Sequence, residues 1–167
     1  MNGNKSTGYP SIDRTWLNYY SEEALNTIIP ESSIYQFFYD SNKDYPKDIA
    51  IEYLNQKITY GEVFEAVDKV ASAFISAGVQ VGEIVTIALP SFPEAIYCVY
   101  ALNKIGAVAN MIHPLAGCED ICNYINEVSS RLVVMYTKTY EICKEMIDGT
   151  CAKKLIVVSA GDSLGFP

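Results

Sequence analysis

The sequence predicts an α/β lobe, in which a mostly parallel sheet is covered by helices on both faces. Two observations support this prediction. Short, continuously apolar segments such as 84–89 and 132–136 have the composition of strands that are buried on both faces. A segment with helical periodicity follows each of them, and strands that alternate with helices form right-handed parallel units. We therefore expect a doubly wound sheet, preceded by an N-terminal arm and a small hairpin.

The first elements follow from local patterns. Aromatic residues in 1–30 show no clear period, so this segment is interpreted as an N-terminal arm with a short helix near 21–27. From Ser33, helical spacing of apolar residues predicts a helix that ends before Pro46, because the residue before a proline avoids the helical region. Alternation in 49–54 and 57–59 predicts a hairpin that turns at Asn55 and Gln56. Residues 31–167 form the predicted lobe.

Two helices begin with the pattern of a capping box, in which a hydroxyl and a carboxylate three residues apart cap each other's backbone amides. Thr59 and Glu62 open a helix that should end at Gly78. Ser91 and Glu94 have the same spacing, with a proline in the first turn, and should open a helix that runs to 106.

The remaining pattern repeats the alternation of strand and helix. We expect strands at 107–112, 132–136 and 155–159, and helices at 118–128 and 140–147. Ligands of such sheets bind beyond the carboxyl ends of the strands, near the point where the strand order reverses. Those ends are predicted at 90–91, 113–115, 137–138 and 160–165.

Composition and charge exclude several classes of protein. The formal net charge is −8, and no stripe of Lys and Arg is present, so the phosphate contacts of nucleic-acid binding and attraction to an anionic membrane are not expected. The apolar runs are far shorter than the ~20 residues that cross a bilayer, and the N-terminus lacks the apolar core of a signal peptide. Five cysteines without framework spacing fit a reducing compartment. A cytoplasmic protein without a transmembrane segment is predicted.

One string resembles a catalytic motif. Residues 161–165 read GDSLG, which matches the G-x-S-x-G turn of serine hydrolases and makes Ser163 a candidate nucleophile. Such a serine needs a helix after it and an acid and a histidine downstream. Only two residues follow the string 161–165, and the sole histidine, His113, lies upstream. A serine esterase is kept as an alternative, while a polar loop is the favoured interpretation.

His113, which precedes a proline at a predicted strand end, is the candidate for a substrate contact. A single histidine without an evident acid partner is more often structural. Cys118 and Cys122, one helical turn apart, can join His113 around a metal, but zinc sites usually use two cysteine pairs, so buried and inert cysteines are predicted. The 13 tyrosines are dispersed and are interpreted as core edges and surface. No catalytic, cofactor-binding or metal residue is assigned.

The order of several short motifs resembles the adenylate-forming superfamily of acyl-CoA synthetases and related AMP-dependent ligases. Residues 58–63 resemble its T-Y-x-E-L helix entry, 77–85 its GV-x-x-GD-x-V turn, and 106–115 its GAV strand and following proline. Residues 90–94 stand at its N-x-PE segment, and 119–121 match the EL or EI that follows the proline. The helix and strand from Ser33 onward resemble the start of that domain. Glu83 stands where the family usually has Asp.

The resemblance implies an enzyme that activates a carboxylic acid with ATP and Mg²⁺ and transfers the acyl group to coenzyme A. The family's phosphate loop, ATP-binding residues and C-terminal lysine would all lie beyond Pro167, so none is assigned to this chain. We expect a fragment of an acyl-CoA synthetase, of fatty-acid type and inactive by itself, whose partner is the missing C-terminal part. A stand-alone, non-catalytic α/β binding or scaffolding module is the alternative.

Overall fold

The central sheet of the lobe has four parallel strands in the order β4-β3-β5-β6. The computed structural model describes residues 6–160 and 162, and the chain divides into two units, residues 1–31 and 32–167. The strands are β3 (Ile84–Ala88), β4 (Val108–Met111), β5 (Leu132–Tyr136) and β6 (Lys154–Val158). In β3 and β5 almost every side chain is buried, as their continuously apolar sequences predicted.

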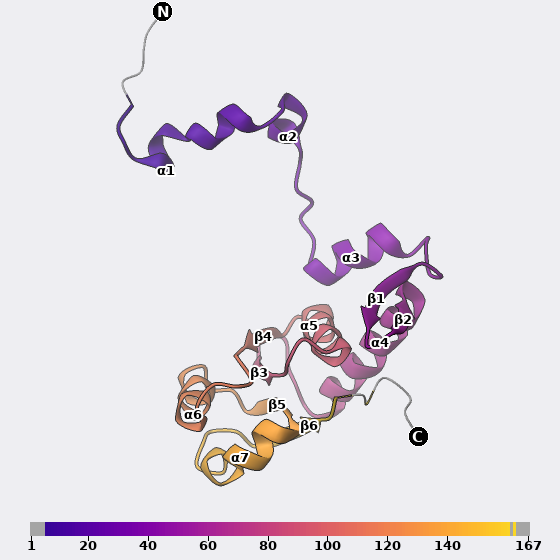
Figure 1. Cartoon of the computed structure of the whole chain (residues 1–167), viewed down its shortest axis with the longest axis vertical. Helices are drawn as coiled ribbons and strands as arrows, with labels where there is room; N and C mark the ends of the chain where they lie inside the picture. Colours follow the sequence, from indigo (N-terminus) through magenta and orange to yellow (C-terminus); the bar gives the residue numbers. More distant parts are fainter. Residues whose placement is uncertain (1–5, 161, 163–167) are drawn as a thin grey trace, which may run out of the picture. The chain divides into compact units, whose positions relative to one another are not determined.

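Helices cover both faces of this sheet (Figure 1). One face carries α4 (Tyr60–Ser76) and α5 (Pro93–Lys104), and the other carries α6 (Cys118–Glu127) and α7 (Thr137–Ile147). The prediction of a doubly wound α/β lobe is therefore confirmed. Among residues 6–160 and 162, no helix is both long enough and apolar enough to cross a membrane.

Each face of the sheet has its own hydrophobic core, because successive side chains of a strand point to opposite faces. Val85, Ile87 and Val134 pack toward α4 and α5, with Phe74 of α4 and Leu102 of α5 fully buried against them. The alternate strand residues face α6 and α7. The second core contains Ala88, Val133, Met135, Ile121, Cys122, Ile125, Cys143 and Ile147.

The capping box predicted at the start of α4 is confirmed. The Glu62 carboxylate accepts hydrogen bonds from the Thr59 amide and hydroxyl, both at 2.8 Å, and the Thr59 hydroxyl accepts from the Glu62 amide at 3.3 Å. Gly61 follows the cap, and its amide donates to the Pro46 carbonyl at 2.9 Å. A Cβ at Gly61 would lie 3.0 Å from that carbonyl oxygen, so this close approach favours glycine.

The predicted hairpin is present, with its turn one residue earlier than expected. Strands β1 (Ile49–Tyr53) and β2 (Gln56–Thr59) pair antiparallel. Leu54 and Asn55 form the turn, and both have positive φ, as in the type I′ turns that suit the twist of a two-residue hairpin. Asparagine tolerates this conformation well, which explains Asn55 at the second position.

Helix α3 (Ile34–Asn42) anchors an aromatic cluster that the sequence analysis missed. Tyrosines that are dispersed in the sequence meet here, so their interpretation as scattered core edges and surface is corrected for this group. The Phe38 ring stacks on Tyr100 with centroids 4.5 Å apart and an interplanar angle of 7°. The aromatic cluster consists of Tyr35, Phe38, Tyr39, Tyr60, Phe64 and Tyr100.

Helix α3 is also held to α5 by two polar contacts. The Tyr35 amide donates to Asn103 Oδ1 at 2.8 Å. The Lys104 ammonium lies 4.9 Å from the centre of the Tyr35 ring and forms an ion pair with Asp68 of α4. Helices α3, α4 and α5 therefore meet at Lys104.

A fully buried serine ties the two central strands of the sheet, β3 and β5, together. Ser130, just before β5, accepts a hydrogen bond from the Thr86 amide of β3 at 2.9 Å. Its hydroxyl has two carbonyl acceptors within reach, those of Ile84 and Leu132. The buried hydroxyl is thus satisfied as both donor and acceptor.

The smaller unit consists of three short helices, α1 (Pro10–Asp13), the 3-10 helix η1 (Thr15–Tyr19) and α2 (Glu22–Asn26). None of their residues is buried. Asp13 accepts hydrogen bonds from Ser6, Thr7 and Gly8, and these bonds, led by that from the Thr7 amide, lower the pKa of the Asp13 carboxyl to about 2. Local hydrogen bonds, rather than a core, give this unit its structure.

Candidate functional site

The strand order places a reversal point between β3 and β5. The chain passes from β3 to β4 on one side of β3, and then crosses to β5 on the other side. Crevices at the carboxyl ends of such strands are where open α/β sheets bind ligands. Phe92, after β3, and Tyr136, at the end of β5, meet there edge to face with ring centroids 5.3 Å apart. This edge of the sheet is the candidate site.

Hydroxyl groups connect the loops along this edge. Thr137, the first residue of α7, donates from Oγ1 to the Val158 carbonyl at 3.1 Å and lies 3.0 Å from Ser159 Oγ. Asp162 accepts a hydrogen bond from the Ser159 amide at 2.8 Å. Thr139 donates to the Pro114 carbonyl at 2.8 Å, which fixes the loop after β4. The polar groups at the ends of β5 and β6 are therefore engaged with one another.

The start of α5 differs from its prediction. Phe92, not Ser91, is the N-cap residue, and no side chain caps the helix. Ser91 is exposed, whereas the Glu94 side chain is buried in the first turn. The second predicted capping box is thus wrong. The Phe92 ring is buried between Tyr53 and Tyr136, so tertiary packing sets the helix start.

Buried Glu94 affects two neighbours one turn along α5. Burial, with a smaller contribution from the Glu94 carboxylate, raises the pKa of the Cys98 thiol to about 12. Burial, with smaller contributions from the Glu94 and Glu62 carboxylates, raises the pKa of Tyr97 to about 12. Both groups are protonated at neutral pH. Cys98 is therefore a packing residue rather than a thiolate nucleophile.

His113 lies in the loop after β4, with an exposed side chain. Its Nδ1 accepts a hydrogen bond from the Leu115 amide at 3.2 Å, so the neutral ring carries its proton on Nε2. His113 lines a cavity of about 390 Å³ together with Tyr124 and Glu127. A role of His113 in substrate contact stays a prediction. Ser163 and the rest of 161–165, apart from Asp162, lie outside the described residues.

The cysteines depart from the sequence-based interpretation. Cys118 of α6 and Cys143 of α7 form a disulfide bond, so the prediction of buried, inert cysteines is wrong for Cys118. Cys98 and Cys122 are free and buried, and Cys151 is free and half-buried. Within 6–160 and 162, no group of three or more His, Cys, Asp or Glu residues is placed to hold a metal ion.

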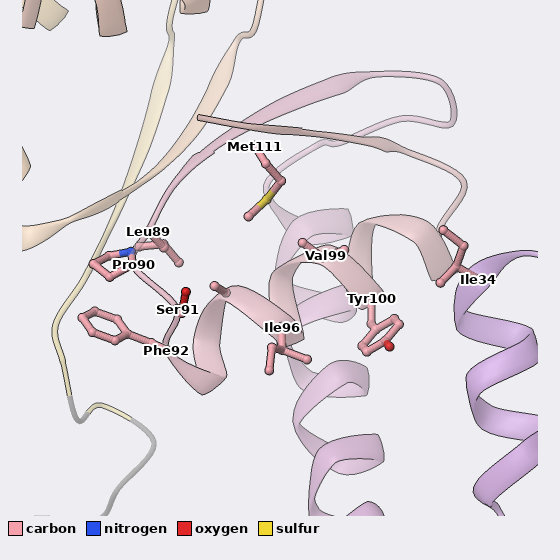
Figure 2. Close-up of a pocket in the computed structure, with 10 residues that line it drawn as sticks. Ile34, Leu89, Pro90, Ser91, Phe92, Ile96, Val99, Tyr100 and Met111 are labelled. Atoms are coloured by element: carbon pink, nitrogen blue, oxygen red, sulfur yellow. The ribbon is translucent and has the colours of Figure 1, made fainter. Parts of the chain in front are cut away.

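A groove of about 490 Å³ opens beside the candidate site, between α3, α5 and the ends of β3 and β4 (Figure 2). Figure 2 shows Ser91 near one end of the groove and Ile34 of α3 near the other. The groove was not predicted from the sequence, because its walls come from four separate elements. Its lining residues are Ile34, Leu89, Pro90, Ser91, Phe92, Ala95, Ile96, Val99, Tyr100 and Met111.

A second hollow, of about 370 Å³, lies on the same face of the sheet between α4, α5 and β6. Its lining combines apolar residues such as Phe74 with three charged ones, Lys69, Glu94 and Asp162. The two hollows thus differ in chemistry: the groove beside α3 is lined by uncharged side chains alone among the described residues.

Comparison with known proteins places this geometry in a family. The family model described as AMP-binding enzyme matches residues 38–165, which is most of the chain. The chain belongs to the AMP-binding enzyme family. Its parallel sheet matches the N-terminal lobe of adenylate-forming enzymes, and the resemblance in the ordered motifs is thereby confirmed.

Relatives of this AMP-binding enzyme chain are much longer than it is. An acetyl-coenzyme A synthetase of Dictyostelium discoideum is 36% identical over 83 residues, which cover 50% of this chain and 12% of the relative. A long-chain-fatty-acid-CoA ligase of Archaeoglobus fulgidus superposes with a TM-score of 0.73 at 21% identity, covering 79% of this chain and 28% of that one. A benzoate CoA ligase of Burkholderia xenovorans gives 0.71 at 18% identity, with 76% and 26% covered.

Proposed function

We propose that this chain is the N-terminal part of an ATP-dependent acid–thiol ligase. In the proposed reaction a carboxylate oxygen attacks the α-phosphorus of ATP, and pyrophosphate leaves. The thiol of coenzyme A then attacks the carbonyl carbon of the acyl-AMP, and AMP leaves. The match of the family model over residues 38–165 carries this proposal, and the reversal point between β3 and β5 supports it.

The described residues supply a scaffold and an apolar wall rather than a nucleotide site. Thr137, Ser159 and Asp162 at the carboxyl edge are bonded among themselves. No cluster of acidic or histidine side chains suited to Mg²⁺ occurs in residues 6–160 and 162. These residues do not fit ATP and Mg²⁺ by themselves, so we assign neither to them. We propose that the chain alone does not form acyl-AMP and needs a further part of the same protein.

A fatty acid is the proposed substrate. The relatives include acetyl-coenzyme A synthetases, and similar folds occur in ligases for fatty and aromatic acids. The uncharged groove beside the candidate site supports a substrate with a long apolar part. The cytoplasmic location favoured by the sequence stays a proposal, and a Cys118–Cys143 disulfide isolated from cells would speak against it.

The groove also favours a second candidate function, a binding module without catalysis, because a hollow in this chain can hold a ligand by itself. The two functions differ in what lies beyond residue 167 and in whether acyl-AMP forms. A reading frame that continues into a phosphate loop supports the ligase, and a stop codon after residue 167 supports the module.

ATP–pyrophosphate exchange tests the proposal. The 167-residue chain and the polypeptide of the complete reading frame are assayed with acetate, octanoate, palmitate and benzoate. We expect no exchange by the chain alone, and exchange by the complete polypeptide that is fastest with octanoate or palmitate. Exchange fastest with acetate overturns the fatty-acid assignment. No exchange with any acid, or exchange by the 167-residue chain alone, overturns the proposed function.

A further inference from the structure

We propose that the Cys118–Cys143 pair is a reversible redox clamp, which fixes the loop between β4 and α6 when the pair is oxidised and releases that loop when it is reduced. The loop consists of residues 112–117 and follows the carboxyl end of β4. It forms part of the wall of the cavity beside His113. Such a clamp works whether or not the complete protein is a ligase.

Two contacts with one face of α7 hold the two ends of this loop. Thr139 donates from Oγ1 to the Pro114 carbonyl at 2.8 Å. Cys143, one turn later on α7, is bonded to Cys118, which directly follows the loop. Residues four apart in a helix share a face, and Thr139 and Cys143 are only 5% and 2% exposed. The loop is therefore fixed at Pro114 by a hydrogen bond and at its other end by a covalent bond.

Reduction would leave the loop with little to hold it on α7. The amides of Leu115 and Ala116 donate to Nδ1 and to the carbonyl oxygen of His113, so these hydrogen bonds shape the loop from within. Leu115 is 79% exposed and adds little packing. Among the described residues, the bond from Thr139 is the hydrogen bond to α7 that remains once the disulfide opens. Loop segments with few buried contacts and exposed hydrogen bonds open most easily.

The two sulfur atoms differ in access, which sets the order of the exchange steps. Cys118 is half-buried and Cys143 is buried, so a small disulfide such as oxidised glutathione reaches Cys118 first. The Cys118 thiolate attacks one sulfur of oxidised glutathione, forms a mixed disulfide and expels one glutathione thiolate. The Cys143 thiolate then attacks Sγ of Cys118, and the second glutathione thiolate leaves. Two electrons and the two thiol protons pass to glutathione, and the reverse sequence opens the clamp.

The other three cysteines compete poorly for this exchange. Burial raises the pKa of the Cys122 thiol above its ordinary value, and the pKa of Cys98 is raised to about 12. The Cys151 sulfur lies 3.5 Å from two carbonyl oxygens to which it can donate its proton. Because the thiolate is the nucleophile in disulfide exchange, protonated thiols react slowly. Exchange is therefore directed to the Cys118–Cys143 pair.

A reversible pair also agrees with the cytoplasmic location, which stays a proposal. Disulfides are rare in the cytosol, and those that form there are usually transient and serve catalysis or redox sensing. We therefore expect two thiols in unstressed cells and the Cys118–Cys143 disulfide after oxidation.

Equilibration of the 167-residue chain with mixtures of reduced and oxidised glutathione tests the chemistry. Acid quenching, alkylation and peptide mass spectrometry measure the fraction of Cys118–Cys143 disulfide. We expect one reversible transition within the glutathione ratios that cells maintain, with Cys122 alkylated throughout. A pair that stays oxidised at every such ratio, or stays reduced in oxidised glutathione alone, overturns the proposal.

The reaction of His113 with diethyl pyrocarbonate measures the release of the loop. His113 is the sole histidine, so a chain without a histidine tag has one imidazole to modify. The lone pair of its Nδ1 is engaged by the Leu115 amide, and acylation there requires the loop to open. Reduction, followed by removal of the reductant, should raise the rate by about fivefold or more, as expected when one hydrogen bond is lost. Equal rates in the oxidised and reduced chain overturn the clamp.

Variants separate the clamp from a general loss of stability. Cys118→Ser should give the fast rate at His113 in either buffer, whereas Cys122→Ser should keep the slow and fast rates of the parent. Thr139→Val removes the other attachment and should raise the rate of the oxidised chain, and Thr139→Ser, which retains a hydroxyl, should restore it. A slow rate in folded Cys118→Ser overturns the proposal. If that variant does not unfold cooperatively, the comparison of oxidised and reduced parent decides.

Discussion

The two faces of the sheet are held together in different ways. On one face, α4 and α5 are attached by packing, by the aromatic cluster and by the Lys104 contacts. On the other, α6 and α7 cover a smaller core and are joined by the Cys118–Cys143 disulfide. The hollows of about 490 and 370 Å³ that α5 lines lie on the α4/α5 face, whereas the cavity beside His113 is lined in part by Tyr124 and Glu127 of α6. The two faces thus differ in how their helices are attached, and the groove lined by uncharged side chains lies on the face without the disulfide.

Removing a large core side chain from the α4/α5 face should have the largest effect. Phe74 is 1% exposed, and Phe74→Ala should lower the free energy of unfolding by about 3–5 kcal/mol. The adjacent Ile75 is 59% exposed, so Ile75→Ala should stay within about 0.5 kcal/mol of the parent. Urea titration followed by circular dichroism measures both. Equal losses would mean that packing of this face contributes little.

Removing the Cys118–Cys143 disulfide, which joins the helices of the α6/α7 face, should lower the free energy of unfolding. The bond closes a loop over a sequence separation of 25 residues, and such a cross-link stabilises by about 3 kcal/mol. Cys118→Ser should lose about that amount in non-reducing buffer, and dithiothreitol should bring the parent down to the level of the variant. Cys122→Ser serves as the comparison, since its thiol is free. If dithiothreitol changes nothing in the parent, the two faces do not differ in this respect.

The capping box should make the smallest of the three contributions to the free energy of unfolding, and this contribution should depend on pH. Hydrogen bonds from the Thr59 amide and then its hydroxyl lower the pKa of the Glu62 carboxyl below its ordinary 4.5. Its contribution is therefore complete above that value and is lost as pH falls through the lowered pKa. Glu62→Gln, which resembles the protonated acid, should cost a few tenths of a kcal/mol at pH 7, and the difference should shrink as pH falls through the lowered pKa of Glu62. Glu65→Gln on the same helix serves as the control for removing a carboxylate outside the capping box.

Local signals in the sequence predicted most of the elements but not how they meet. Thr59 and Glu62 form the expected cap because their hydrogen bonds need only neighbouring residues. Ser91 and Glu94 have the same spacing, yet burial of the Phe92 ring moved the helix start and turned Glu94 inward. The same local spacing thus predicted the wrong helix start where tertiary packing outweighed a side-chain hydrogen bond.

Features that depend on contacts between residues far apart in the sequence could not be predicted from local sequence patterns. The Cys118–Cys143 pair exists because α6 and α7 lie side by side, which spacing alone does not reveal. The groove combines α3 with residues of α5 and β4, far from it in the sequence. The alternation of strand and helix did predict the carboxyl edge of the sheet, and with it the neighbourhood of Ser91.

The contacts of α3 give the groove a firm end wall. Ile34 closes the groove, and α3 is held to α5 by a hydrogen bond from the Tyr35 amide to Asn103, by the Lys104 ammonium and by the stack of Phe38 on Tyr100. The floor is likewise part of the packing of α5 on the sheet. Whatever fills the groove would therefore be limited in length by α3, because this helix shares its packing with the floor.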